Sequence, residues 1–201
     1  MRTPTRRLSV VIGGLLLAGA VSPALAAGGR PVRVTRDGVS ILVPPPWGNR
    51  TALVAHDPQL ARTVDAGGPL PLLYLTAPIV EFFSPNLILQ RSPATLGDVA
   101  TAQVLGVLHR ELLGSVPRGE HRLPAHLPAR IGGFPTTGEQ LRGSLSGIVA
   151  GAPMTVSVIG QVFFIDVRGA LYLLRFTVPA SLWSHFQPAW TAMLRSLSFS
   201  G

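Results

Sequence analysis

Residues 153–179, which read PMTVSVIGQVFFIDVRGALYLLRFTVP, constrain the fold more than any other stretch of this chain. Two runs rich in β-branched, aromatic and aliphatic residues flank the turn sequence Asp166-Val167-Arg168-Gly169, and this spacing predicts a β-hairpin. We expect Gly169 to take a positive φ and to close the turn with a one-residue bulge. Apolar side chains occupy both faces of the first run, so the hairpin should lie in the middle of a sheet that is covered on both sides.

The first residues have the parts of an export signal. Arg2, Arg6 and Arg7 precede an apolar stretch over 8–20, and the small residues of Ala24-Leu25-Ala26 offer a cleavage site before Ala27. The sequence therefore predicts a signal peptide at 1–26, a short lead-in at 27–31 and a single domain at 32–201. Two alternatives remain open, a retained membrane anchor and export by the twin-arginine route.

The apolar core of the signal is shorter than a membrane span requires, so no stable span is expected after cleavage. We therefore expect a secreted or cell-envelope protein. Cleavage also removes three arginines and lowers the formal net charge from +8 to +5. The remaining arginines are scattered and are not interleaved with aromatic residues, which argues against nucleic-acid binding. The chain contains no cysteine, which excludes disulfides, thiolate chemistry, cysteine-ligated metals and a lipid-modified N-terminal cysteine.

Hydrophobic periodicity outlines the rest of the chain. Helices are expected at 57–64, at 96–113 with Ser92 or Thr95 as its cap, and after residue 179 with Ser181 or Gln187 as its cap. Trp47, which follows three prolines, is expected to cover the core. Further strands are expected at 39–43, 72–77, 86–90, 139–149 and 197–199, with an edge strand or extended segment over 122–131. This order predicts an α+β domain with one mostly antiparallel sheet covered by helices.

Four stretches resemble motifs of a known family: GVSILVPPPW at 38–47, SPNLIL at 84–89, IGGFP at 131–135, and the closing segments 172–179 and 194–199. Their order is similar to that in the PsbP-like (PsbP/Mog/LpqN) family, and in style is closest to the bacterial exported LpqN type. The resemblance implies an α/β/α sandwich with a central, mostly antiparallel sheet flanked by two or three helices. It also implies a binding or assembly role rather than an enzymatic one.

Patterns of reactive residues point in the same direction. In Gly143-Ser144-Leu145-Ser146-Gly147 a leucine stands where a nucleophile elbow needs its serine. Residues 133–138 have the outer spacing of a phosphate-binding loop, but Glu139-Gln140 follows in place of the required lysine and hydroxyl residue. The sequence therefore predicts no catalytic residue, no cofactor-binding residue and no metal site.

One surface feature suggests a binding role. Arg122, His126 and Arg130 alternate with apolar residues on the segment that contains Pro124 and Pro128, and Arg118 lies nearby. These four basic residues, Arg118, Arg122, His126 and Arg130, form the predicted basic face. The face would either discourage edge-to-edge aggregation or bind an anionic partner, whether an envelope protein, a glycan or a lipid.

The leading hypothesis is therefore an exported, non-catalytic binding or assembly module of the cell envelope. An alternative is a carrier of a small apolar or glycolipid ligand between the sheet and a helix, suggested by the 47% hydrophobic composition. A hydrolase is a weaker alternative.

Overall fold

The computed structural model describes residues 29–55, 70–95, 121–123, 125–149 and 152–200. The expected signal peptide, the helices expected at 57–64 and 96–113, and Arg118 lie outside these ranges. The predicted division of the chain therefore stays a prediction.

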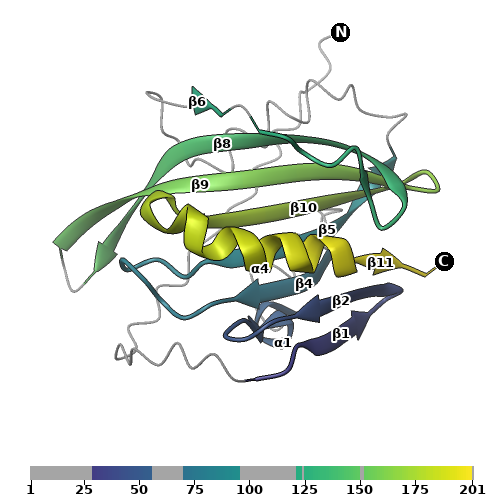
Figure 1. The fold of residues 1–201 in the computed structure, drawn as a ribbon, viewed down its shortest axis with the longest axis horizontal. Coiled ribbons are helices and arrows are strands. Elements are labelled where there is room, and N and C mark those ends of the chain that lie inside the picture. The colour runs from purple at the N-terminus through teal and green to yellow at the C-terminus, as the bar shows by residue number, and fades with distance from the viewer. Residues whose placement is uncertain (1–28, 56–69, 96–120, 124, 150–151, 201) are drawn as a thin grey trace, which may run out of the picture.

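The main sheet has eight strands, and its neighbouring strands are antiparallel (Figure 1). Its order along the path is β3 (Gly48–Asn49), β4 (Leu70–Thr76), β5 (Asn86–Thr95), β10 (Ala170–Pro179), β9 (Ala152–Val167), β8 (Phe134–Val149) and β6 (His121–Arg122), and β7 (Arg130–Ile131) pairs with β8. The expected hairpin of β9 and β10 does lie in the middle. Of the two caps expected for the helix at 96–113, Ser92 is wrong, because β5 continues through it; β5 pairs with β10 up to Arg91 and, after a register shift, again at Thr95.

The turn between β9 and β10 differs from the expected one. The pairing continues without a shift to Val167 and Ala170, so the loop contains only Arg168 and Gly169. Both have a positive φ, 55° for Arg168 and 87° for Gly169, which is the backbone of a two-residue hairpin turn rather than a bulge. The Asp166 carboxylate accepts a hydrogen bond from the Gly169 N–H at 2.8 Å and so stabilises the turn.

The sequence predicts a single sheet, but the strands form two. β1 (Val32–Arg36), β2 (Val39–Val43) and β11 (Ser198–Phe199) form a separate antiparallel sheet of three strands. The prolines at 44–46 end β2, because a proline cannot donate to a strand ladder, and the main sheet begins only after Trp47. The last strand then pairs with β2, which joins the two ends of the domain.

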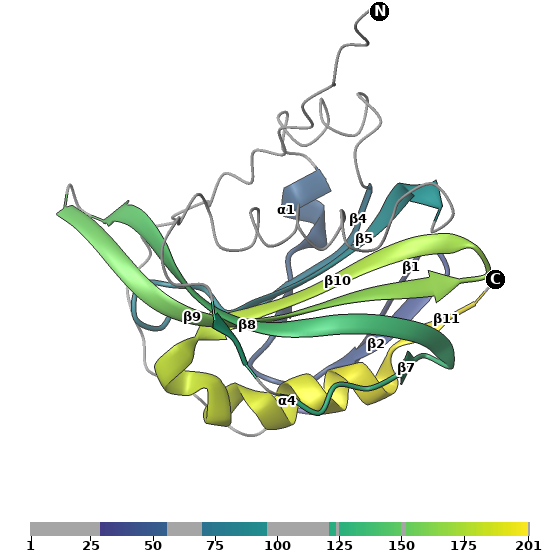
Figure 2. The same cartoon turned by 90° about the horizontal axis from the view of Figure 1, so that it is seen from above.

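The final helix, α4 (Trp183–Ser196), packs against one face of the main sheet and follows a short 3₁₀ turn, η2 (Ala180–Leu182) (Figure 2). Phe186, Trp190 and Met193 are its buried residues. The expected caps are wrong: Leu182 is the N-cap and makes no side-chain cap bond, while the Ser181 hydroxyl bonds to Glu81. The fold is therefore α+β with a mostly antiparallel sheet. The helices expected at 57–64 and 96–113 lie outside the described ranges, so the three-layer sandwich stays a prediction.

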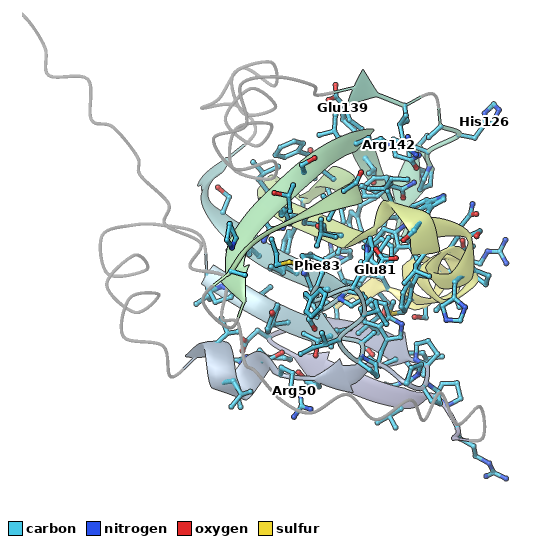
Figure 3. All side chains as sticks on the ribbon, turned by 90° about the vertical axis from the view of Figure 1, so that its left-hand side faces the viewer. Arg50, Glu81, Phe83, His126, Glu139 and Arg142 are labelled. Carbon is cyan, nitrogen blue, oxygen red and sulfur yellow. The ribbon has the colours of Figure 1, made fainter. Side chains whose placement is uncertain are left out.

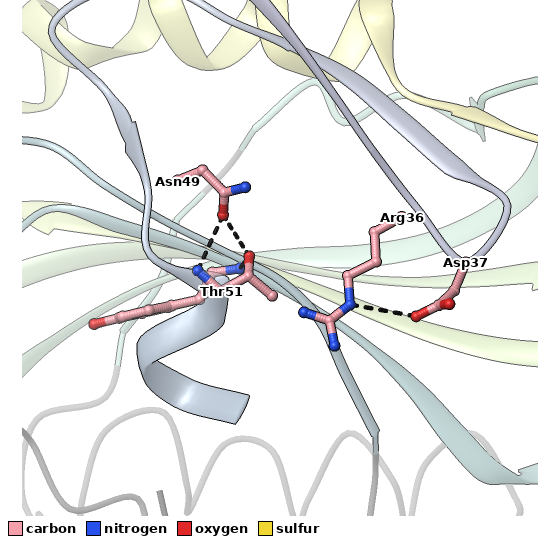
Figure 4. Close-up of polar contacts among 5 residues, drawn as sticks. Arg36, Asp37, Asn49 and Thr51 are labelled. Atoms are coloured by element: carbon pink, nitrogen blue, oxygen red, sulfur yellow. Dashed lines mark hydrogen bonds and ion pairs between the residues drawn. The ribbon is translucent and has the colours of Figure 1, made fainter. Parts of the chain in front are cut away.

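A short helix, α1 (Thr51–Ala55), is fixed to β4 through one buried hydroxyl (Figure 4). Asn49 Oδ1 accepts hydrogen bonds from the backbone N–H of Thr51 at 3.0 Å and from its hydroxyl at 2.6 Å. The hydroxyl oxygen of Thr51 in turn accepts the backbone N–H of Tyr74 at 2.9 Å. Figure 4 also shows the exposed ion pair of Arg36 with Asp37, at 3.3 Å, on the hairpin of β1 and β2.

Candidate binding surfaces

Aromatic side chains fill the interface between the main sheet and α4. Phe176 of β10 stacks on Trp190 of α4 with ring centroids 4.4 Å apart and planes 5° from parallel. Trp47 packs against both Phe176 and Phe186, at 5.7 and 5.9 Å between centroids, which confirms that it covers the core. A carrier would need this space for its ligand, so the packing argues against the carrier hypothesis on this face of the sheet.

A chain of polar side chains crosses the same interface. Trp190 Nε1–H donates to Gln161 Oε1 at 2.6 Å, and Gln161 Nε2 donates to Gln140 Oε1 at 2.5 Å. These bonds connect α4 to β9 and β9 to β8, and Gln161 is 8% exposed. Because each buried polar group on Gln161 has a partner, this chain is a structural element of the core rather than an open site.

Two other buried polar atoms, Trp47 Nε1 and Thr177 Oγ1, have no hydrogen-bond partner within the described part of the chain. Trp47 packs on the face of β10 that carries Phe176, whereas Thr177 is the next residue along the strand and points to the opposite face. The two atoms therefore do not converge on one polar site.

The described ranges contain no group of three or more His, Asp or Glu side chains placed to hold a metal ion. Within the same ranges, none of the helices combines the length and the apolar character that crossing a membrane would require.

The structure describes only part of the predicted basic face, because Arg118 lies outside the described residues and only the backbone of Arg122 is described. Arg122 lies on β6, where its backbone pairs with Leu141, and His126 is exposed at the periphery of the molecule (Figure 3). The Arg130 guanidinium donates two hydrogen bonds to the carbonyl oxygen of Gly133, at 2.9 and 2.6 Å, and so holds the turn between β7 and β8. The binding of an anionic partner by Arg118, Arg122, His126 and Arg130 therefore stays a prediction.

Among the described residues of segment 122–131, those that pair with β8 lie at its two ends, Arg122 at one and Arg130 with Ile131 at the other. Ile131 is buried and Leu127 is half-buried, as the alternation predicts, whereas Ala125 and Ala129 are exposed. Pro128 has no backbone N–H, which agrees with the absence of a strand over the described residues 125–128.

A second surface, which the sequence analysis missed, is the connection between β4 and β5. Val80 and Phe83 exchange two backbone hydrogen bonds of 2.9 Å, and the two residues between them have positive φ, 50° at Glu81 and 61° at Phe82. We call the segment from Ile79 to Phe83 the Phe82 turn. Bulky residues rarely adopt this backbone, which costs about 1–3 kcal/mol at each position.

Several contacts hold the Phe82 turn in place. Ser181, just before α4, donates its hydroxyl to Glu81 Oε1 at 2.5 Å. At the base of the loop the N–H of Ala77 donates to the carbonyl of Pro85 at 2.9 Å, and the Ser84 hydroxyl donates to the carbonyl of Ala77 at 3.1 Å. Figure 3 shows Glu81 and Phe83 together, well apart from His126.

The Phe82 side chain is 55% exposed on this fixed turn, and Ile79 beside it is also exposed. An aromatic residue in a loop between Pro78 and Pro85 was the available sequence signal. This signal did not predict the turn, because turns with two positive φ values are expected at Asn-Gly or Asp-Gly, not at Glu-Phe.

No family model matches the sequence, and no curated protein sequence matches it. Among solved structures, the chain is similar to LpqN of Mycobacterium tuberculosis, a protein involved in cell envelope biogenesis. That match has 19% identity, covers 87% of this chain and 88% of that chain, and has a TM-score of 0.46. A second similar structure is the cyanobacterial PsbP (CyanoP) from Synechocystis sp. PCC 6803, with 16% identity, 90% and 98% coverage and a TM-score of 0.49.

A third is PA94 of Pseudomonas aeruginosa, a protein of unknown function and putative regulator, with 12% identity, 86% and 99% coverage and a TM-score of 0.38. LpqN and PsbP are two of the three proteins after which the family in the sequence resemblance is named.

Proposed function

We propose that this protein is an exported, non-catalytic binding or assembly module of the cell envelope and that it contacts its partner through the Phe82 turn. The observation that carries the proposal is an aromatic side chain, 55% exposed, on a backbone with two successive positive φ values. Strain of this kind persists only where the surrounding contacts enforce it, and it is concentrated at sites that bind ligands or partners.

The Phe82 turn has the properties of a binding anchor. Aromatic residues dominate the energetics of protein interfaces when they enter an apolar pocket. The bonds from Ser181 to Glu81 and across Val80 and Phe83 fix the turn in advance, so little conformational entropy remains to be lost on binding. We therefore propose an envelope protein with an apolar pocket as the partner, since the carboxylate of Glu81 disfavours an anionic lipid surface.

The sequence supports both the proposed export and the proposed binding or assembly role. The signal-like segment at 1–26 supports a location outside the cytoplasm, and the motifs at 38–47, 84–89 and 131–135 resemble a family with binding and assembly roles. The filled layer between the sheet and α4 supports a role carried out at the surface rather than in an internal cavity.

Site-specific crosslinking in the native envelope tests the proposal. A photoreactive amino acid at Phe82 should capture a defined partner, while the same group at Leu53 of α1, which is 62% exposed, provides a matched control. With the isolated partner, Phe82→Ala should weaken binding about tenfold or more, and Leu53→Ala should leave it unchanged. Equal capture from both positions, or equal affinity of both alanine variants, would refute the role of the Phe82 turn.

A further inference from the structure

The far ends of β8 and β9 project from the body of the domain as a two-stranded ribbon (Figures 1 and 2). We call this part, residues 143–149 of β8 paired with 152–158 of β9, the distal ribbon. Its register runs from Gly143 opposite Val158 to Val149 opposite Ala152. No charged residue and no histidine occurs anywhere between residues 143 and 158. A two-stranded ribbon of this kind is only marginally stable alone in water.

The outer edge of β8 changes character where the ribbon begins. Before it, the edge is occupied: the N–H of Thr136 donates to Ala129, and the carbonyl of Gln140 accepts the N–H of Leu123, both at 2.9 Å. These bonds show that the even-numbered residues of β8 direct their backbone groups outward, because the direction alternates along a strand. Ser144, Ser146 and Ile148 therefore present N–H and C=O groups at the outer edge.

Within the ranges that the structure describes, no strand pairs with the outer edge of β8 beyond Arg142. Open edges in natural proteins are usually protected by charged side chains, proline or a bulge. Residues 143–149, GSLSGIV, contain no charge and no proline, and their pairing with β9 shows no bulge. This edge is therefore suited to accept another strand.

The sequence of the edge fits a second copy of the same chain. Gly-Ser-Leu-Ser-Gly at 143–147 reads the same in both directions, with Leu145 at its centre. Antiparallel pairing about a two-fold axis at Leu145 places Ser144 opposite Ser146 of the second copy, and both serines direct their backbone groups outward. Each copy then donates and accepts the same hydrogen bonds, as a two-fold symmetric interface requires.

The same pairing sets Leu145 opposite Leu145 of the second copy. This is a non-hydrogen-bonded pair, in which the two side chains come closest, with about 4.5 Å between the Cα atoms. Leu145 is half-buried and lies on the same face of the ribbon as Val156, its partner on β9. Because the ribbon carries no charge, no like charges oppose each other across the pairing.

We propose that the protein forms a two-fold symmetric dimer in which the distal ribbons of two copies pair through β8, with the axis at Leu145. The dimer would extend the main sheet of one copy into that of the other. A strand from a different protein would have no need of the symmetric sequence, and the experiments below distinguish the two occupants.

Disulfide trapping tests the position of the axis. Because the chain has no cysteine, Leu145→Cys introduces a single thiol, and a pair about 4.5 Å apart is within the range that a disulfide can bridge. Mild oxidation of the mature variant should yield a covalent dimer. Ser157→Cys, exposed on β9 of the same ribbon, is the matched control, since its copies would be about 14 Å apart, three strand spacings.

Charge exchange tests the same contact without a covalent bond. Sedimentation should show a concentration-dependent dimer for the wild type, monomers for Leu145→Lys and for Leu145→Glu alone, and a mixed dimer when the two variants are combined. Recovery in the mixture excludes misfolding as the cause of dissociation. A monomeric wild type together with equal trapping of Leu145→Cys and Ser157→Cys would overturn the proposal, as would a Leu145→Lys variant that dimerises like the wild type.

Discussion

Gln161 connects three elements of the core, so replacing it with leucine should destabilise the domain in a predictable way. Gln161→Leu removes the acceptor of the Trp190 indole N–H, at 2.6 Å, and the donor to Gln140, at 2.5 Å. Trp190 is 2% exposed, so its N–H cannot turn to water instead. Gln140 is half-buried and can be solvated in part.

The expected loss of stability follows from the two groups that lose their bond to Gln161, the Trp190 N–H and the Gln140 side chain. A buried donor left without a partner costs about 1–3 kcal/mol, and the leucine side chain offsets some of this by burying apolar surface. We expect a net loss of about 2 kcal/mol in the free energy of unfolding. For a domain of this size that corresponds to a fall in Tm of about 4–8 °C.

Thermal and urea unfolding of the mature protein, followed by far-ultraviolet circular dichroism, measures the loss. Gln140→Leu is the comparison, because it leaves the Trp190 bond in place and removes only the acceptor of Gln161 Nε2, a buried donor that should cost about 1–3 kcal/mol when unpaired. The same Gln161→Leu change in a Trp190→Phe background should cost clearly less, because no indole N–H is left unpaired. An unchanged Tm for Gln161→Leu, or an equal loss in both backgrounds, would refute the reasoning.

Three further predictions concern single residues. Burial raises the pKa of Tyr74 above its usual 10.0, while Arg175 acts in the opposite direction. The unfolded chain therefore ionises first, and stability should fall as the pH rises above 10 through the folded pKa; urea unfolding from about pH 9 to about pH 12 should show this fall, and Tyr74→Phe should reduce it. Thr51→Val keeps the shape but leaves the Tyr74 N–H without its acceptor, and should cost about 1–3 kcal/mol by thermal unfolding, whereas Thr51→Ser should cost less. Phe82→Gly relieves the positive φ and should raise stability by about 1 kcal/mol while partner binding falls; lower stability in urea would contradict a strained turn.

Local patterns were sufficient for the elements but not for all their pairings. The hairpin of β9 and β10 was predictable because both strands and the turn lie within one short stretch of alternating apolar residues. The separate sheet was not, because β11 pairs with β2 across almost the whole length of the chain, and only the completed domain brings Ser198 beside Ser40.

The same limit applies to the surfaces. Ser181 is a good helix cap by residue type, but its hydroxyl bonds instead to Glu81, a hundred positions away. The Phe82 turn depends on that bond and on the pairing of β4 with β5, so its backbone could not be read from Glu-Phe alone. Arg130 shows the converse: its charge was predictable, but its contact with the Gly133 carbonyl was not.

All three tryptophans of the chain, Trp47, Trp183 and Trp190, contact the single ring of Phe176. The intrinsic fluorescence of the whole protein therefore originates from one layer, the contact between β10 and α4. An emission shift during unfolding will report when this helix leaves the sheet and will be insensitive to the ribbon of β8 and β9. Tryptophan emission therefore reports on a single interface of the molecule, and a probe elsewhere is needed to follow the other strands.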